Sequence, residues 1–320
     1  MLYNSFMKKK LLIQILVTAA LTIFSQTLFS QTDKKIVNIE TEQKSETTAS
    51  YFRFNASYIS NSVYLGRRDS LTLPYFTPSL TYYNKSGFNA SLSLGYLNSS
   101  TEKRVDYFSV DLGYDFKIAE KLSASIYANK TFNNDNSSRV NGDIKGTFGT
   151  SLSYDLDAIQ WSAGMSAMFD NKTDIFIFSS INHPFYFGED DKQWTISPLA
   201  LVNFSTLHFY EGYTSRDFGK KNFGSGPLIA SATATTTVDN NKMTLMNYEF
   251  SLPISYDSKN FGVYLTPTYS IPQNAIKTQT TLDITYKNGT KTSNTFNSTP
   301  YSERNLSNNF YVEAGVYFNF

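Results

Sequence analysis

The sequence contains no cysteine and only two histidines among its 320 residues. Without cysteine the chain cannot form the disulfide framework of a small secreted scaffold, and it offers no thiol for lipid attachment. Charged residues are scarce as well, because Asp, Glu, Lys and Arg make up 17% of the chain, against about 25% in ordinary soluble domains. The net charge of +1 argues against a nucleic-acid partner, which would require a strongly basic surface.

Long apolar runs are also missing, except near the N-terminus. Lysines at 8–10 precede an apolar run from residue 11 to about 28, and small and polar residues follow, which is the three-part pattern of a secretory signal. Gln14, Ser25 and Gln26 interrupt this run, which disfavours a membrane anchor. We therefore predict a signal peptide over residues 1–30 and a flexible leader over the polar residues 31–49. No later run approaches the roughly 18 apolar residues of a membrane helix.

The rest of the chain is rich in aromatic residues, and its apolar and polar residues alternate. From Ser50 onward apolar and polar residues alternate with a period of two, which predicts β-strands with two unlike faces. The final stretch, YVEAGVYFNF, follows this rule to its end. Together with the preceding Phe310, this stretch has an expected apolar face of Phe310, Val312, Ala314, Val316, Phe318 and Phe320. Its polar face carries Tyr311, Glu313, Gly315, Tyr317 and Asn319.

Segments of this kind predict about twelve strands, each long enough to cross a bilayer when tilted. They cover residues 50–60, 74–83, 88–98, 105–117, 121–131, 142–156, 158–169, 173–182, 193–204, 243–257, 260–271 and 308–320. The eighth of these, 173–182, is apolar on both faces at Ile175, Phe176, Ile177 and Phe178, so its register cannot be read from the pattern.

The connections between these strands alternate in length. Most even-numbered strands end in tight turns, whereas most odd-numbered strands end in longer loops, including Ser205 to Lys242 and Pro272 to Ser307. Outer-membrane barrels have short periplasmic turns and longer external loops, so both termini are expected on the periplasmic side. Two connections beside the eighth strand depart from the rule, since His183 to Lys192 is long and Asp170 to Lys172 is short. In the last loop, Asn288-Gly289 predicts a hairpin with a type I′ turn.

The polar face separates a membrane barrel from a soluble sandwich, which also alternates. It carries mainly Ser, Asn, Thr, Gly and Tyr rather than Lys, Glu and Arg, as suits a confined lumen. An open sheet edge in hydrocarbon leaves backbone groups unpaired at several kcal/mol each, so the first strand must pair with the last. The sequence therefore predicts an all-β fold, a closed antiparallel transmembrane β-barrel of about twelve strands over residues 50–320.

With its aromatic last strand ending in Phe, the chain resembles bacterial outer-membrane β-barrel proteins. Its Asn- and Lys-rich composition, with Gln after the expected cleavage site, is similar to barrels of the Bacteroidota. The resemblance implies the outer membrane of a Gram-negative cell envelope, in contact with outer-membrane lipid and lipopolysaccharide. It also implies that the barrel-assembly machinery reads Tyr311, Tyr317, Phe318 and Phe320 as a targeting signal.

Four charged residues, Arg53, Asp111, Glu249 and Glu313, are expected to face the lumen, and Arg53 and Glu313 to approach each other on neighbouring strands. They favour either a selectivity constriction in a pore or an interior network that fills a narrow barrel. The first interpretation makes the protein a porin-like channel for small solutes. The second makes it a closed scaffold that presents the loops 205–242 and 272–307 to an extracellular or secretion partner.

A lipid-modifying enzyme is the weakest hypothesis. Outer-membrane enzymes of this kind resemble one another in placing His and Ser at i and i+2, whereas Ser205 and His208 occur here in reverse order and one residue further apart. We predict no catalytic residue, no metal site and no cofactor. The cations expected on the external side could pair with lipid A phosphates: Arg67, Arg68, Lys103, Arg104, Arg139, Arg216, Lys220 and Lys221.

Overall fold

The computed structural model describes residues 49–189, 192–222, 229–238, 242–298, 303 and 306–320. One antiparallel sheet closes on itself, because β1 (Tyr51–Ile59) pairs with both β4 (Tyr75–Tyr83) and β20 (Asn309–Asn319). The predicted signal peptide, and the predicted leader up to residue 48, lie outside the described residues.

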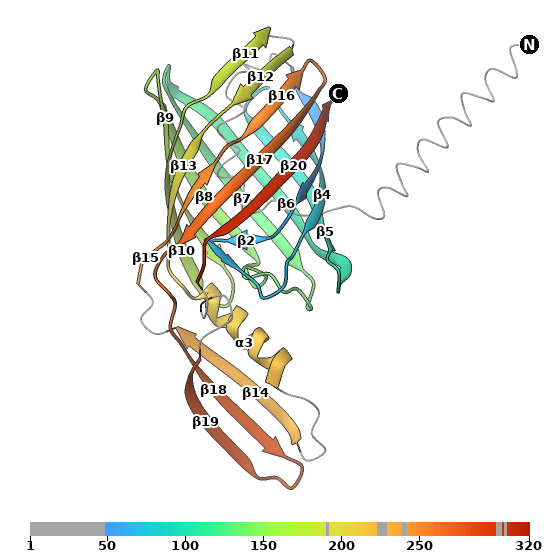
Figure 1. The fold of residues 1–320 in the computed structure, drawn as a ribbon, viewed down its shortest axis with the longest axis vertical. Helices are drawn as coiled ribbons and strands as arrows, with labels where there is room; N and C mark the ends of the chain where they lie inside the picture. The colour runs from blue at the N-terminus through green and yellow to red at the C-terminus, as the bar shows by residue number, and fades with distance from the viewer. Residues whose placement is uncertain (1–48, 190–191, 223–228, 239–241, 299–302, 304–305) are drawn as a thin grey trace, which may run out of the picture.

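The barrel has twelve spans, as predicted (Figure 1). Three of them are each divided into two segments, namely β10 (Thr173–Asn182) with β11 (Phe185–Glu189), β12 (Lys192–Ile196) with β13 (Leu199–Ser205), and β15 (Thr244–Ser251) with β16 (Ile254–Ser258). The other spans are β1, β4, β5 (Phe88–Asn98), β6 (Lys103–Ala119), β7 (Leu122–Asn133), β8 (Gly146–Asp155), β9 (Gln160–Phe169), β17 (Phe261–Pro272) and β20.

The divisions fall at prolines that form a row across neighbouring spans. The N–H groups of His183, Ser197 and Leu252 donate to the carbonyls of Pro198, Pro253 and Pro267 over 3.2, 2.9 and 3.0 Å, respectively. Because proline has no N–H, each pair lacks the reciprocal bond. The register nevertheless continues across each division, since Asn182 pairs with Leu199 and Phe185 with Ile196.

This continuity corrects the predicted long turn from His183 to Lys192. The eighth span passes through Pro184 to Glu189, which pairs with Lys192 in a tight hairpin. The register that the sequence could not give is also settled, because Phe176 and Phe178 are buried inside the barrel whereas Ile177 is exposed on its outer face.

The two faces of the sheet differ as alternation predicts. The outer face exposes large apolar side chains such as Leu92, Phe148 and Phe250, whereas the inner face buries small polar ones such as Ser109 and Ser162. An apolar band of this kind is what a barrel presents to lipid. Within the described part of the chain, no helix has the length and apolar character that would let it cross a membrane.

A second structure projects from one end of the barrel, as Figure 1 shows. It combines α3 (Phe209–Asn222) with a three-stranded sheet of β14 (Ile229–Val238), β18 (Thr278–Tyr286) and β19 (Lys291–Ser298). We call this the loop domain, its end of the barrel the loop end, and the opposite end, where β20 finishes, the turn end. A short pair, β2 (Val63–Tyr64) and β3 (Arg67–Arg68), also lies at the loop end.

The predicted hairpin between β18 and β19 is present, but its turn is not type I′. Type I′ requires positive φ at both central residues, whereas Gly289 has φ 84° and Asn288 is not among the residues with positive φ. The Gly289 N–H donates to the Tyr286 carbonyl over 2.9 Å. Within the Asn288-Gly289 pair, positive φ is therefore found at one position, Gly289, not at both.

Candidate functional site

The strand pairing places all four predicted lumen residues on the inner face of the barrel. Arg53 and Asp111 share that face with the buried Ser57 and Ser109, and Glu249 shares it with the fully buried Asn247. Glu313 is itself buried, at 3% exposure.

Arg53 lies near the turn end and is surrounded by tyrosines. Its Nε donates to Asn319 Oδ1 over 2.9 Å, and its guanidinium lies 4.3 Å from the ring centre of Tyr317. A guanidinium over an aromatic face at this distance gains a cation–π attraction. Arg53 is thus held against the barrel wall by its neighbours on the last strand.

The predicted approach of Arg53 to Glu313 is wrong. Arg53 pairs with Asn319, whereas Glu313 pairs with Ile59, six residues further along β1. At the rise of a β-strand, about 20 Å separates the two positions. The sequence correctly made their strands neighbours, but the register between the strands was not readable from it.

Amide and hydroxyl groups donate hydrogen bonds to two of the lumen carboxylates, Asp111 and Glu249. Asp111 accepts from Asn129 Nδ2 over 2.9 Å and from Ser109 Oγ over 3.1 Å. Glu249 Oε1 accepts from Asn247 Nδ2 over 2.8 Å and from Ser270 Oγ over 3.2 Å. These amide and hydroxyl donors orient the two carboxylates.

Asp115 and Asp257 are further carboxylates on the inner face. Asp115 accepts from Ser125 Oγ over 2.5 Å and from Asn89 Nδ2 over 2.8 Å, and Asp257 accepts from the Tyr317 hydroxyl. Asp115 follows Asp111 by four residues, so the same period-two pattern already signalled its position. Asp257 was harder to assign, because Pro253 interrupts the strand that it shares with Glu249.

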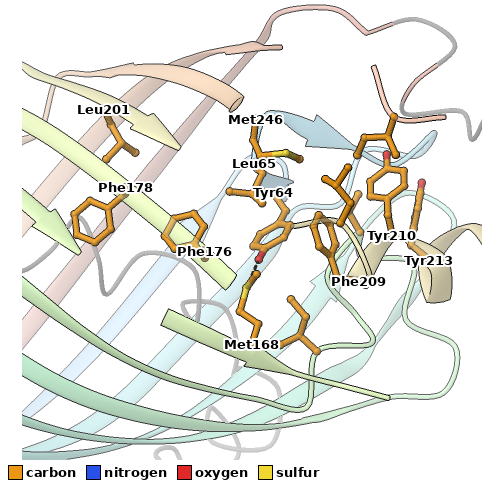
Figure 2. Close-up of a cluster of buried hydrophobic side chains, with 14 of the residues drawn as sticks. Tyr64, Leu65, Met168, Phe176, Phe178, Leu201, Phe209, Tyr210, Tyr213 and Met246 are labelled. Carbon is orange, nitrogen blue, oxygen red and sulfur yellow. Dashed lines mark hydrogen bonds between the residues drawn. The ribbon is translucent and has the colours of Figure 1, made fainter. Parts of the chain in front are cut away.

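A packed apolar cluster, which we call the mouth core, lies at the loop end of the barrel, and Figure 2 shows most of its side chains. Phe176 and Phe178 reach it from the barrel wall, and Tyr64 and Leu65 from the β2–β3 turn. The Tyr64 hydroxyl donates to Met168 Sδ over 2.8 Å. The remaining members are Val140, Ile144, Leu199, Leu201, Leu207, Phe209, Tyr210, Tyr213, Met246 and Ile276.

A fully buried ion pair lies beside this cluster. Arg67 Nε donates to Glu303 Oε1 over 3.1 Å, and both side chains have no exposed surface. Arg67 also donates to the carbonyls of Leu65 and Met246 over 2.7 and 2.6 Å. Glu303 accepts in addition from the Tyr210 hydroxyl over 2.7 Å. Segments that are far apart in the chain are therefore joined at one point.

This burial corrects part of the predicted lipid A contact surface. Arg67 is enclosed, Arg139 is buried with its guanidinium 3.9 Å from the Tyr107 ring centre, and Arg104 pairs with Glu102 and Asp106. Arg68 and Lys103 are exposed, as a lipid contact would require. The side chains of Arg216, Lys220 and Lys221 lie outside the described part of the structure.

The loop domain is anchored to the barrel wall by Asp174 on β10. This buried carboxylate accepts from the backbone N–H groups of His208 and Phe209 over 2.8 and 2.6 Å. These N–H groups precede and begin α3, so Asp174 satisfies donors that the helix leaves free. The helix thereby starts at a fixed point on the barrel.

Ser205 and His208 are not joined as a nucleophile and its base. Ser205 Oγ donates to the Thr206 carbonyl over 2.7 Å, while His208 Nδ1 lies 3.4 Å from Glu211 Oε1. Among the described residues, no three His, Asp or Glu side chains are grouped so that they could hold a metal ion.

No protein-family model matches the chain, and no curated protein sequence matches it. Solved structures similar to it include a KdgM porin, with 8% identity and a TM-score of 0.41, covering 84% of this chain and 99% of the porin. A NanC porin has 11% identity and a TM-score of 0.41, with coverage of 84% and 100%. LpxR from Salmonella typhimurium has 9% identity and a TM-score of 0.42, also with coverage of 84% and 100%. These likenesses are distant, and the barrel is established by its own strand pairing.

Proposed function

We propose that the protein is an outer-membrane barrel that acts as a narrow pore for small solutes. The observation that carries this proposal is the contrast between the faces of the closed sheet, apolar outside and lined with Ser, Thr, Asn and Gly inside. A polar interior is typical of barrels that conduct water and solutes. Twelve strands give a lumen between the filled eight-stranded barrels and the open porins of sixteen or more.

The turn end faces the periplasm in this proposal. The tight turns, the beginning of β1 and the end of β20 all lie there, whereas the loop domain lies at the other end (Figure 1). Short periplasmic turns and long external loops support this orientation. The outward-facing Phe318 and Phe320, together with Tyr311 and Tyr317, form the proposed barrel-assembly signal on the last strand.

The mouth core gives the pore a closed external end. Conduction therefore requires the loop segments that carry Tyr64, Phe209 and Tyr210 to move away from the barrel wall. Those segments meet at the Arg67–Glu303 pair, so this pair is the natural place to weaken the closure.

The test is single-channel conductance of the refolded protein in planar bilayers, with the double variant Arg67→Ala, Glu303→Ala alongside. Heat-modifiable migration on gels confirms that each sample is a folded barrel. Steady openings, more frequent in the variant, are expected of a pore closed at its mouth. Electrical silence of both folded proteins would overturn the proposal.

A second candidate function is a closed scaffold that presents the loop domain to an extracellular or secretion partner. The favouring observation is that α3 and the β14–β18–β19 sheet are built from the loops 205–242 and 272–307 and project beyond the barrel. Silence of both proteins in the bilayer, with the loop domain exposed at the cell surface, would favour the scaffold.

A further inference from the structure

We infer that the lumen selects cations, so that the solutes of the proposed pore are small positively charged species; this inference rests on the proposed function. The first observation is the charge on the inner face. Across the described spans, the paired inward positions carry three cations, Arg53, Lys117 and Arg104, and Arg104 forms ion pairs with Glu102 and Asp106 at the loop end. They also carry seven carboxylates: Asp111, Asp115, Asp155, Asp174, Glu249, Asp257 and Glu313.

This imbalance is specific to the lumen. The whole chain has 28 basic and 27 acidic residues and a net charge of +1. Carboxylates are therefore concentrated on the inner wall, while the balancing cations lie elsewhere in the chain. An acidic composition of the protein as a whole does not explain the charge of the lumen.

The second observation is the depth of these charges in the barrel. Arg53 is two residues from the start of β1, and Lys117 is two residues from the end of β6, so these two cations lie near the turn end. Asp111 lies eight residues before the end of β6, and Glu249 nine residues before the end of β16. Glu313 lies six residues before the end of β20. The middle of the described lumen thus carries carboxylates and no cation.

The third observation is that these carboxylates occupy different walls. Counting around the closed sheet, β6 and β15 are six spans apart in either direction, so Asp111 and Glu249 stand on opposite walls at similar depth. Glu313 on β20 adds a third position, beyond β17 from Glu249. We call Asp111, Glu249 and Glu313 the acidic belt.

A belt of this kind acts on ions through its field. Walls of low dielectric focus the field of like charges along a narrow passage, which raises the local concentration of counter-ions. Rings of Asp and Glu are the arrangement that favours cations in channels.

The experiment is the reversal potential of the purified barrel under a KCl gradient across a planar bilayer. The protein, or its Arg67→Ala, Glu303→Ala variant if openings of the former are rare, should pass K⁺ several-fold better than Cl⁻. The belt variant Asp111→Asn, Glu249→Gln, Glu313→Gln keeps the shapes of the side chains and should bring the permeability ratio close to unity. The control Asp135→Asn, Asp283→Asn removes exposed carboxylates outside the lumen and should leave the ratio unchanged.

The outcomes separate the inference from the function on which it rests. Absence of openings in folded barrels overturns the pore itself. Openings that prefer Cl⁻, or that prefer neither ion, leave the pore standing and overturn cation selection. A K⁺ preference that persists in the belt variant overturns the assignment to Asp111, Glu249 and Glu313. If the belt variant does not fold, the single change Glu249→Gln must still lower the ratio relative to the control.

Discussion

Arg67 and Glu303 form an ion pair across 3.1 Å with both side chains fully buried. The two residues are 236 positions apart in the sequence. Arg67 reaches the pair from β3, and Glu303 connects it to Tyr210 on α3 and to the backbone N–H of Ile276. The pair therefore joins three regions of the chain at the loop end of the barrel.

We expect Glu303→Gln to open the loop end while the barrel stays folded. Removing one charge of a buried pair typically costs about 3–5 kcal/mol, because the other charge is left uncompensated. The loops should become sensitive to protease, whereas heat-modifiable migration should not change, since local opening need not unfold the barrel. Lys172→Gln, which breaks an exposed pair with Glu211, is the matched control. Equal protease resistance in wild type and Glu303→Gln would contradict the prediction.

We expect Pro198→Ala to leave the barrel at least as stable as the wild type. The new N–H at residue 198 faces the His183 carbonyl, so it can complete a pair that now has one bond. A net gain of about 1 kcal/mol is typical of such a bond, and it offsets the entropic cost of losing a proline, which is roughly 0.4–1 kcal/mol. The measurement is the urea midpoint of the barrel folded in lipid vesicles, and a midpoint below that of the wild type would refute the idea.

Gly315→Ala should destabilise the junction between β17 and β20. A methyl group at residue 315 would lie 2.4 Å from Cζ of Tyr264, its cross-strand partner, so the ring would have to leave the wall. Overpacking of this kind costs about 1–3 kcal/mol. Tyr264→Ser removes the ring and should restore most of the loss in a double-mutant cycle followed by urea unfolding. Strictly additive effects of the two changes would show that the contact is not the cause.

Changing Phe318 and Phe320 to Ser should abolish assembly of the heat-modifiable barrel in cells. Phe320 exchanges two backbone hydrogen bonds with Phe52, over 2.8 and 2.9 Å, and its ring lies 6.2 Å from that of Phe52. The end of β20 therefore both closes the sheet and carries the proposed targeting residues. Phe310→Ser, on the same outward face at the loop end of β20, should have little effect. Normal migration and surface exposure of the Phe318, Phe320 variant would end the targeting proposal.

Alternation along single strands was enough to give the barrel its spans. The predicted strand 88–98 coincides with β5, and the last strand has the outward and inward faces that its sequence indicates. Each strand has one face toward apolar surroundings and one toward the lumen, so the pattern is local and survives in the sequence. It failed at 173–182, where Phe176 and Phe178 face inward into the mouth core and remove the polar signal.

The sequence by itself therefore determined the fold class, the number of spans, the closure of the first strand on the last and the inward face of Arg53, Asp111, Glu249 and Glu313. Only the tertiary structure decided the distance between Arg53 and Glu313, the burial of Arg67 and the opposition of Asp111 and Glu249. The physical reason is the distance along the chain over which each feature is encoded. The face of the sheet on which a residue lies is set by the alternation of its neighbours in the chain. The register between distant strands and the packing of loops depend on contacts that no local pattern encodes.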